Sequence, residues 1–522
     1  MLVRAVACLC LLTGGAVALV SLTSPAGADQ DEVVFDNDSP STQRNIGIAS
    51  AEAGTTEEPR RELFEGWQRP EVALFLTGRQ HGYIEPCGCT GLENAKGGLS
   101  RRHFFLTQLR KSGWDVVPLD VGNQVERFGR QAELKFQTTT DILRAMQYQA
   151  VGFGPDDMRL SVDELLPSIL GNGEDPPMFV SANVEILDPE LTPRFRVIQA
   201  GGKRIGVTSI LGLVESRAIN SDNVRVLNPT TALQQVLPKL QQSRCDLLVL
   251  LAHTDLDATR KLATQFPMFH VIVTAGGAGE PTLDPEVVAG TQIIQVGTKG
   301  MYVGVVGVFN DNRTPLRYER VPLDGRFSDS DKVLELFAAY QQQLKVLGLS
   351  GLGLKPVPYP SAEPRRFVGH AACADCHTEA TAVFEDTDHA HATESIAKPS
   401  QRAAIPRHFD PECLSCHVTG WNPQEYFPYI SGYLDYTASA ELHSNGCENC
   451  HGPGSLHVAA ENGDIDVSEE KIEQYREEMR LTLEQARKTK CAECHDLDNS
   501  PDFHHDGAFE EYWEKVKHEG KD

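Results

Sequence analysis

Four short segments in the last third of the chain repeat the arrangement Cys-x-x-Cys-His, at 373–377, 413–417, 447–451 and 491–495. The composition of the chain predicts about 0.01 such copies by chance. Two thiols separated by two residues on one helical turn reach the two vinyl groups of a haem, and the adjacent imidazole then faces the iron. We therefore expect four covalently bound c-type haems. The attaching thiols are Cys373, Cys376, Cys413, Cys416, Cys447, Cys450, Cys491 and Cys494, and the proximal iron ligands are His377, His417, His451 and His495.

Zinc sites, structural disulfides and thioredoxin-like redox pairs are the alternatives for paired cysteines. Zinc requires thiols in fours and no His after every pair, and a disulfide across two residues is reactive rather than structural. Of the 17 histidines, 13 follow residue 366, whereas Met479 is the only methionine there. Most haems are therefore expected to have two imidazole ligands, which lowers the reduction potential relative to His/Met ligation.

The net charge of the chain limits which kinds of molecule it is expected to bind. The 522 residues include 48 Lys and Arg against 73 Asp and Glu, which gives a net charge of −25. Nucleic acids and anionic lipid surfaces attract basic proteins, so neither is expected as a partner. An acidic surface instead suits transient docking of redox partner proteins, most simply basic ones.

The N-terminal end has the pattern of a secretion signal. Arg4 precedes an apolar run, and Ala26-Gly27-Ala28 fits a cleavage site, which predicts a signal peptide over 1–28. The apolar run is marginal for a membrane span, so no stable span is expected after cleavage. Residues 29–67 are acidic, with few aromatics, and are predicted to be a disordered lead-in. We expect an exported protein, periplasmic or otherwise extracytoplasmic, in an oxidising compartment.

Residues 68–347 alternate between apolar, strand-like runs and helical patterns, which predicts an α/β domain. The expected strands are 72–76, 114–119, 245–251, 271–274, 291–296 and 302–308, and the expected helices are 98–112, 133–148, 229–243, 256–265 and 332–347. Residues 348–365, rich in Gly and Pro, are predicted to be a linker. Residues 366–522 hold all four motifs, and four porphyrins there should leave little room for a separate apolar core.

Further segments around the motifs follow a family pattern. They are Phe367-Val-Gly-His370, 387–392, 416–421, 447–457, 495–503 and 512–518. With these segments, about 366–522 resembles the multihaem cytochrome c-554 family, which implies a mainly helical and loop-rich multihaem domain. The resemblance implies that His389, His457 and His518 are distal iron ligands. His408, His443 and His370 are candidates for the fourth haem, whose iron otherwise stays open, and the sequence does not pair each distal His with its haem.

The N-terminal region also carries a recognisable frame. Its segments are 97–102, 119–122, 150–154, 181–184, 251–253 and 295–304. Over roughly 68–345 the chain resembles the calcineurin-like metallophosphatase domain of bacterial periplasmic 5′-nucleotidases, which implies an α/β sandwich.

The metal-binding pattern of that family is altered here. Two-metal phosphoesterases need about six or seven Asp, Asn and His ligands. The family's D-x-H-G falls on 79–82, its G-D on 122–123, its G-N-H-E on 154–157 and its G-H-x-H on 276–279. Of the ligands, only His81 and His253 are unchanged, because Arg79 and Asn123 replace aspartates and glycines replace the last pair of histidines. The resemblance therefore implies that the metal pair and ordinary nucleotidase activity have been lost.

Two thiols close to His81 are a candidate replacement for the lost site. Cys87 and Cys89, with His81, His253 and Arg79, could hold a soft metal ion, act as redox thiols or bind an oxyanion. Alternatively, Cys87 and Cys89 form a vicinal disulfide or only stabilise a local turn and take part in no chemistry.

Together the patterns predict an exported tetrahaem cytochrome that moves electrons, fused to a metallophosphatase-like domain without its metal pair. Two enzymatic alternatives stay open. One is an oxidoreductase acting on a small nitrogen or sulfur oxyanion at an open haem iron. The other is a hydrolase with altered metal ligands.

Overall fold

The computed structural model describes residues 62–87, 91–93, 95–171, 177–497 and 499–520. The predicted signal peptide and most of the predicted lead-in lie outside these ranges, as does Cys89. Residues Ile46–Asp522 form one compact unit. Within the described ranges, no helix has both the length and the apolar character needed to cross a membrane.

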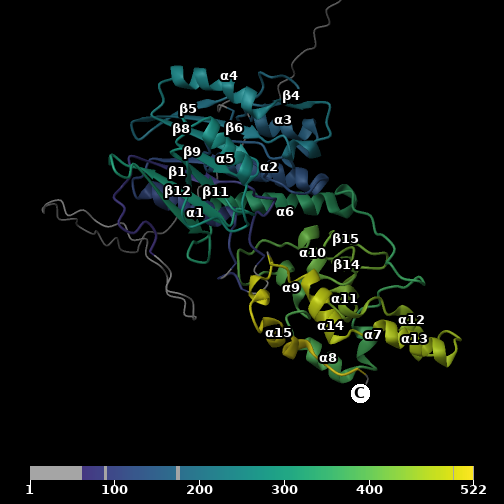
Figure 1. Ribbon diagram of the computed structural model, residues 1–522. Coiled ribbons are helices and arrows are strands. Elements are labelled where there is room, and N and C mark those ends of the chain that lie inside the picture. Colours follow the sequence, from purple (N-terminus) through teal and green to yellow (C-terminus); the bar gives the residue numbers. More distant parts are fainter. Residues whose placement is uncertain (1–61, 88–90, 94, 172–176, 498, 521–522) are drawn as a thin grey trace, which may run out of the picture. The chain divides into compact units, whose positions relative to one another are not determined.

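The first sheet of the N-terminal region has the strand order β13-β12-β1-β2-β3 (Figure 1). Strand β1 pairs in parallel with β2 and antiparallel with β12, so the sheet is mixed. The strands are β1 (Val72–Thr77), β2 (Val116–Asp120), β3 (Ala150–Val151), β12 (Tyr302–Val308) and β13 (Leu316–Pro322).

The second sheet has the order β10-β11-β9-β8-β6-β5, with four parallel central strands and antiparallel edges. Its strands are β5 (Arg196–Ala200), β6 (Lys203–Leu211), β8 (Leu247–His253), β9 (Val271–Thr274), β10 (Glu286–Val288) and β11 (Thr291–Gln295). A small separate pair is formed by β4 (Val184–Ile186) and β7 (Val224–Val226).

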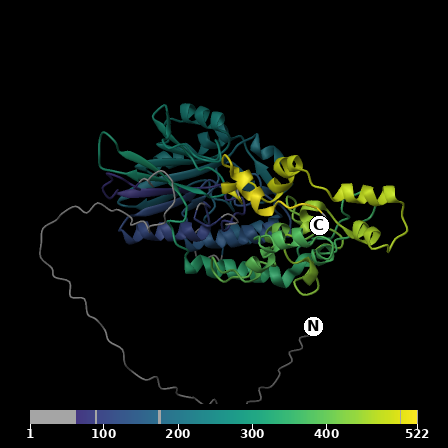
Figure 2. The ribbon, with the colours of Figure 1, turned by 90° about the horizontal axis from the view of Figure 1, so that it is seen from below.

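Strand β1 is buried on both faces, which shows how the layers stack. Ala73 and Phe75 belong to an apolar cluster with the helices on one side, whereas Leu74 and Leu76 belong to the cluster between the two sheets. Successive side chains of a strand point to opposite faces, so the apolar residues of β1 fill both layers. The first outer layer is α1 (Leu99–Lys111), α2 (Arg130–Ala145), α3 (Val162–Leu170) and α6 (Asp331–Gly351), and the second is α4 (Pro229–Gln242) and α5 (Leu256–Gln265) (Figures 1 and 2). The predicted α/β sandwich is confirmed.

The C-terminal region is helical and rich in loops, as predicted. Its helices are α7 (Ala371–Ala374), α8 (Thr378–Glu385), α9 (Ala392–Ala397), α10 (Pro411–His417), α11 (Cys447–His451), α12 (Ser455–Glu461), α13 (Glu469–Met479), α14 (Leu483–Gln485) and α15 (Ala508–Val516). Strands β14 (Trp421–Asn422) and β15 (Phe427–Pro428) form a short hairpin.

The expectation that this region has no apolar core of its own is wrong. Seven buried side chains pack together, because residues from the loops between the motifs converge around α10. They are Phe367, Ile396, Leu414, Val418, Trp421, Tyr433 and Leu442. The cluster is small beside the three clusters of the N-terminal sandwich.

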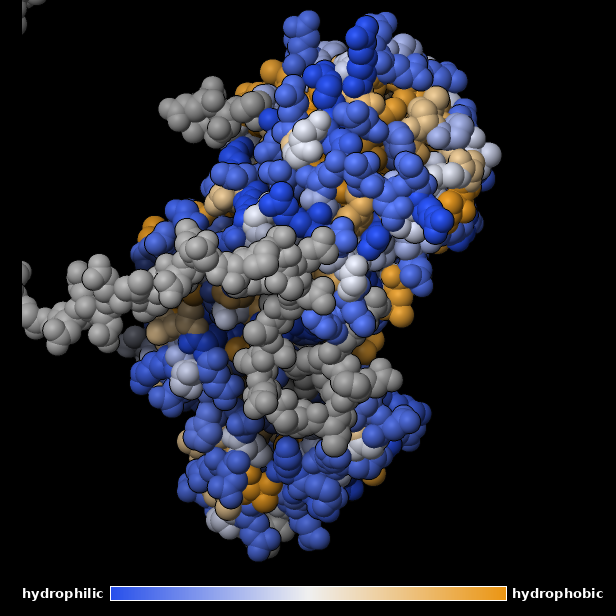
Figure 3. Space-filling view, turned by 90° about the vertical axis from the view of Figure 1, so that its left-hand side faces the viewer, coloured by the Kyte–Doolittle hydropathy of each residue, from blue (hydrophilic) through white to orange (hydrophobic). Residues whose placement is uncertain are grey.

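The face drawn in Figure 3 is mostly hydrophilic, with apolar residues scattered over it. Because the net charge of the chain is −25, a partner that docks by long-range attraction would be basic.

Candidate functional site

Each Cys-x-x-Cys-His segment lies on a single helical turn. The backbone N–H of His377 donates to the Cys373 carbonyl at 3.0 Å, and that of His495 donates to the Cys491 carbonyl at 2.9 Å. The second and third motifs lie on α10 and α11. This local geometry is the one that brings both thiols and the imidazole of a motif to one side of the backbone.

Helix α10 shows why the sequence folds this way. The Asp410 carboxylate accepts a hydrogen bond from the Glu412 backbone N–H at 3.0 Å, and Pro411 occupies the first helical position. Acidic caps and a proline at that position both favour a helix start. The helix therefore begins two residues before Cys413.

The four motif imidazoles share one hydrogen-bonding arrangement. The Nδ1 atom of His417 lies 2.7 Å from the Ala392 carbonyl oxygen, and that of His451 lies 2.6 Å from the Met479 carbonyl oxygen. The Nδ1 atoms of His377 and His495 lie 3.3 Å from the Gly520 carbonyl and 2.9 Å from the Ser500 hydroxyl, respectively. A carbonyl only accepts, so Nδ1 carries the proton in the three carbonyl pairs, and Nε2 is left with a lone pair for a metal ion.

Three motif imidazoles face a second imidazole. The ring centres are 6.3 Å apart for His377 and His457, 6.0 Å for His495 and His389, and 5.9 Å for His451 and His518. Two imidazoles that share one metal ion need about 6 Å between ring centres, since each metal–nitrogen bond is roughly 2 Å and the ring adds about 1 Å on each side. The separations therefore fit one iron between each pair.

His417 differs from the other three motif histidines. Within the described ranges no aromatic or imidazole ring makes a ring contact with it. The three remaining candidates lie against other side chains: His408 against Phe409 and Tyr436, His443 against Tyr433 and Tyr436, and His370 against Phe384. His443 also uses its Nε2 atom to donate to the Tyr436 carbonyl at 2.8 Å. None of the three makes a ring contact with His417, although the backbone of His443 forms a β-bridge with Val418, the residue after the second motif.

The attachment thiols approach each other in two pairs. The Cys373 thiol hydrogen-bonds with Cys447, and this contact, followed by burial, raises the pKa of Cys373. The Cys416 thiol hydrogen-bonds with Cys494, and the pKa of Cys416 is raised for the same two reasons. None of the eight motif cysteines is in a disulfide, so all are available for attachment. Motifs one and three, and motifs two and four, are thus neighbours.

The phosphatase-like site lies at the carboxyl ends of β1 and β2. The loop after β1 runs beside the loop after β2, since the backbone N–H groups of Arg79 and His81 donate to the carbonyls of Gly122 and Asn123 at 2.8 and 3.1 Å. The Asn123 amide donates to the Asp156 carboxylate at 2.9 Å. Asn123 and Asp156 occupy positions at which the metallophosphatase family has metal ligands, but here they bond to each other.

Two other positions of the family pattern have a structural role here. The Asp157 carboxylate accepts backbone N–H groups of Asn123, Gln124, Val125 and Gly154 at 2.7 to 3.3 Å, and so ties the two loops together. At Gly277, an added Cβ would lie 2.2 Å from the Gln295 side chain. A side chain there would require Gln295 to move and would adopt a φ near 105°, which other residues rarely adopt, and as a glycine the position supplies no ligand.

The structure brings together three members of the predicted N-terminal set, His81, His253 and Arg79. His253 is buried, and its Nδ1 donates to the Val121 carbonyl at 3.2 Å. Burial is the main cause of the lowered pKa of His81, to about 3, and the charges of Arg79 and His253 lower it further. Cys87 instead lies near Cys413 and Cys416, whose thiol pKa values it helps to raise. No group of three His, Cys, Asp or Glu suited to a metal ion occurs in the described ranges.

The N-terminal sandwich and α10 share a polar junction that sequence reasoning missed. Asp410 accepts hydrogen bonds from Gln131 at 2.7 Å and Gln341 at 3.1 Å, and Lys135 pairs with Glu412 at 2.5 Å. The Asp-Pro-Glu sequence before Cys413 marks a helix start, but nothing in it indicates the partners on α2 and α6.

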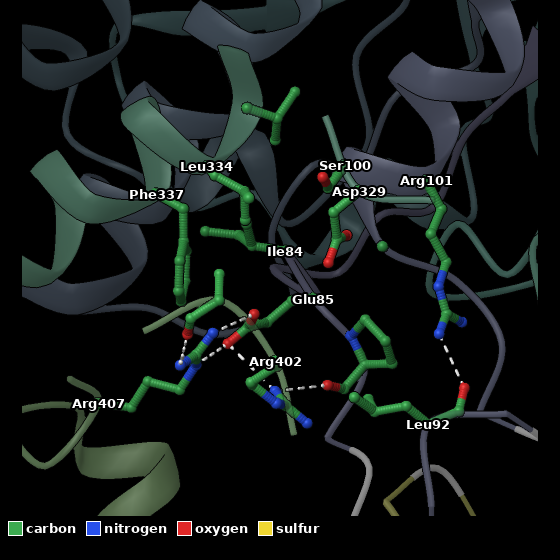
Figure 4. Close-up of a pocket in the computed structure, with 14 residues that line it drawn as sticks. Ile84, Glu85, Leu92, Ser100, Arg101, Asp329, Leu334, Phe337, Arg402 and Arg407 are labelled. Atoms are coloured by element: carbon green, nitrogen blue, oxygen red, sulfur yellow. Dashed lines mark hydrogen bonds and ion pairs between the residues drawn. The ribbon is translucent and has the colours of Figure 1, made fainter. Parts of the chain in front are cut away.

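A second set of contacts surrounds a pocket beside the first. Glu85 pairs with Arg407 and Arg402, and Arg402 also donates to the Pro86 carbonyl at 3.1 Å (Figure 4). Arg101 lines the same pocket and donates to the Leu92 carbonyl at 2.8 Å. The loop that carries Cys87 is therefore held against the segment before α10.

Comparison with known proteins addresses both regions. Residues 372–452 match the family model of cytochrome c554 and c-prime. Cytochrome c-554 of Nitrosomonas europaea is 34% identical over 98 residues, which are 17% of this chain and 39% of that protein. The match implies covalently bound c-type haem, which the Cys-x-x-Cys-His turns and their Nδ1-anchored imidazoles fit.

The N-terminal region matches 5′-nucleotidases. The human 5′-nucleotidase is 22% identical over 215 residues, 39% of this chain and 37% of that protein. The structure of a 5′-nucleotidase precursor from Thermus thermophilus is 21% identical, with a TM-score of 0.46, and the match covers 53% of this chain and 59% of that one. The chain thus spans less than two thirds of these relatives. Both resemblances noted in the sequence are confirmed, and they indicate an electron-transfer haem protein fused to a phosphoesterase-like domain.

Proposed function

We propose that this protein is an exported tetrahaem c-type cytochrome that transfers electrons between partner proteins. When bound, haem supplies the one-electron chemistry; the chain supplies attachment, axial ligands and the spacing of the sites. The observation that carries the proposal is the set of three imidazole pairs with ring centres 5.9 to 6.3 Å apart. Each pair joins one motif histidine to one histidine from elsewhere in the region.

The ligand assignment follows from these pairs. His457 is the distal ligand opposite His377, His389 is opposite His495, and His518 is opposite His451. The Nδ1 atom of His518 donates to the Val516 carbonyl at 2.9 Å, so its Nε2 is also left for a metal ion. Two neutral imidazoles on one iron favour a low-spin centre of low potential.

The contacts between motifs support electron transfer along the region. Cys373 touches Cys447, and Cys416 touches Cys494, so haems held by these thiols would be close neighbours. The acidic charge of the chain favours a basic redox partner, whose binding should weaken as ionic strength rises.

The test is a haem count combined with single ligand substitutions. Pyridine-haemochrome analysis of the full chain, produced with c-haem maturation proteins, should give four haems per chain. His457→Ala, His389→Ala and His518→Ala should each convert one haem from low to high spin in the visible spectrum.

His505→Ala is the matched control, since the His505 side chain is exposed and makes no ring contact with a motif imidazole among the described residues. It should leave every haem unchanged. Absence of covalent haem, or distal variants with unchanged spectra, would refute the assignment.

A second candidate function is favoured by His417. With no second imidazole facing it among the described residues, the haem of the second motif would keep an open iron position. The protein would then be an oxidoreductase acting on a small nitrogen or sulfur oxyanion. Addition of nitrite or sulfite should shift the spectrum of one haem in four if this is right, and a spectrum unchanged by both anions would leave electron transfer as the function.

A further inference from the structure

The phosphatase-like site carries a guanidinium without a counter-ion. Arg79 lies two residues beyond the end of β1, and its side chain is half-buried. Among the described residues, no group forms a hydrogen bond or ion pair with this guanidinium. A partly desolvated charge without a partner is costly, so its presence needs a reason.

The carboxylates at this edge of the sheet are committed elsewhere. Asp120 accepts hydrogen bonds from the Gly122 backbone at 2.8 Å and from the side chains of Gln124 and Thr77. Asp157 accepts backbone N–H groups, and Asp156 bonds to Asn123. None of the three is free to neutralise Arg79.

Glu126 is the remaining acid near Arg79. Its side chain is 56% exposed, and its carboxylate lies 3.6 Å from the His81 Nδ1 atom. It raises the pKa of Arg79 by attraction, but burial has the larger, opposite effect and lowers that pKa. One exposed carboxylate at a distance thus compensates the guanidinium only in part.

His81 and Lys299 lie in the same electrostatic environment as Arg79. His81 reaches the Thr298 hydroxyl at 3.4 Å through Nδ1, and the charge of the next residue, Lys299, acts on the His81 imidazole. Arg79 and Lys299 together make the surroundings of His81 positive. The loop that holds Arg79 and His81 is fixed to the loop after β2 by backbone hydrogen bonds, so the donors are held in place.

We propose that Arg79, with His81 and Lys299, binds a small oxyanion such as phosphate or sulfate without a metal ion. A guanidinium presents two parallel N–H groups to two oxygens of such an anion, which is its preferred geometry. The positive charge that metal ions supply in two-metal phosphoesterases is supplied here by side chains. The site is a binding site, and no hydrolysis is assigned to it. It does not depend on the state of the haems.

The test is calorimetric titration of the haem-loaded, full-length protein with inorganic phosphate and with sulfate, in buffer containing EDTA. Arg79→Gln should weaken binding at least tenfold, whereas Arg313→Gln, at an exposed arginine, should leave it unchanged. Glu126→Gln should tighten binding several-fold, because it removes the negative charge that acts on Arg79. A tighter-binding variant cannot be explained by misfolding.

Binding of either anion with this pattern of variants supports the proposal. No binding of either anion, equal binding by Arg79→Gln, or binding that EDTA abolishes would overturn it. Thermal unfolding with and without the anion gives an independent reading. The anion should stabilise the wild type and not the Arg79→Gln variant, since a ligand of the native state raises its stability.

Discussion

The two regions of this chain are stabilised in different ways. The N-terminal sandwich has three large apolar clusters, in which strands such as β1 are buried on both faces. The C-terminal region has one small cluster, and most of its helices are short. Short helices are marginal without tertiary packing. We therefore expect the first region to fold on side-chain packing alone and the second, with its small cluster, to depend on bound haem as well.

The largest expected effect is a loss of structure in the C-terminal region when haem is not attached. Production of the chain without haem attachment should remove protection from hydrogen exchange over 366–520 and leave β8 and β9 protected. The reason is that the apolar cluster of the C-terminal region is small, so haem should supply most of the apolar surface buried there. Hydrogen exchange measured by mass spectrometry checks this. Protected motif helices in the haem-free chain would show that the region does not need haem to fold.

A pair of core substitutions tests the same difference. Leu251→Ala, between the two sheets, should lower the free energy of unfolding of the sandwich by about 2–5 kcal/mol and leave the haem spectra unchanged. Leu414→Ala, in the small cluster beside Cys413, should instead perturb the haem of the second motif. Denaturant unfolding and visible spectroscopy on both variants provide the comparison. Altered haem spectra in Leu251→Ala would contradict it.

The junction between the regions should give an intermediate effect. Asp410→Ala removes the cap of α10 and the acceptor for Gln131 and Gln341, so it should cost about 1–3 kcal/mol. Ser468→Ala removes the cap of α13, which has no such partners, and should cost about 1 kcal/mol or less. Thermal unfolding of both variants checks the difference. Equal costs would mean that the junction contacts contribute nothing.

The smallest expected effect is the pH dependence of the folding stability of the sandwich that arises from His270. The Leu248 backbone N–H donates to His270 Nδ1 at 3.0 Å, and burial lowers the pKa of His270. Because the folded pKa lies below the unfolded one, the native state binds fewer protons, so stability is full above about pH 6.5 and falls as the pH drops below it. The loss should be about 1 kcal/mol or less, the value of one hydrogen bond. His270→Gln should make this slope shallower in unfolding measured from pH 7 to pH 5, where His81 and His253, whose pKa values burial also lowers, still contribute. An unchanged slope would exclude a contribution from His270.

Part of the fold could be read from the sequence because the strands with apolar runs are buried on both faces. Strands β1, β8, β9 and β12 lie within a few residues of their predicted positions. Strand β6, which is central in the second sheet, was missed because Thr208 and Ser209 interrupt its apolar pattern. Their hydroxyls donate to the Arg194 and Val180 carbonyls at 2.6 Å, so they are satisfied only in the folded chain.

The candidate sites divide in the same way. The attachment thiols and proximal histidines are specified by spacing along one helical turn, so their positions could be listed from the sequence. The pairing of His377 with His457, across eighty residues, depends on how the loops fold and could not. The unpaired state of Arg79 depends on where Asp120, Asp156 and Asp157 point, which the sequence does not show.

The most direct test of the account is low-temperature electron spin resonance of the fully oxidised, haem-loaded protein. We expect at least three low-spin haems, one for each imidazole pair, and a high-spin signal from the haem bound at His417 would favour the second candidate function. Fewer than three low-spin haems would contradict the three ligand pairs on which the proposed function rests.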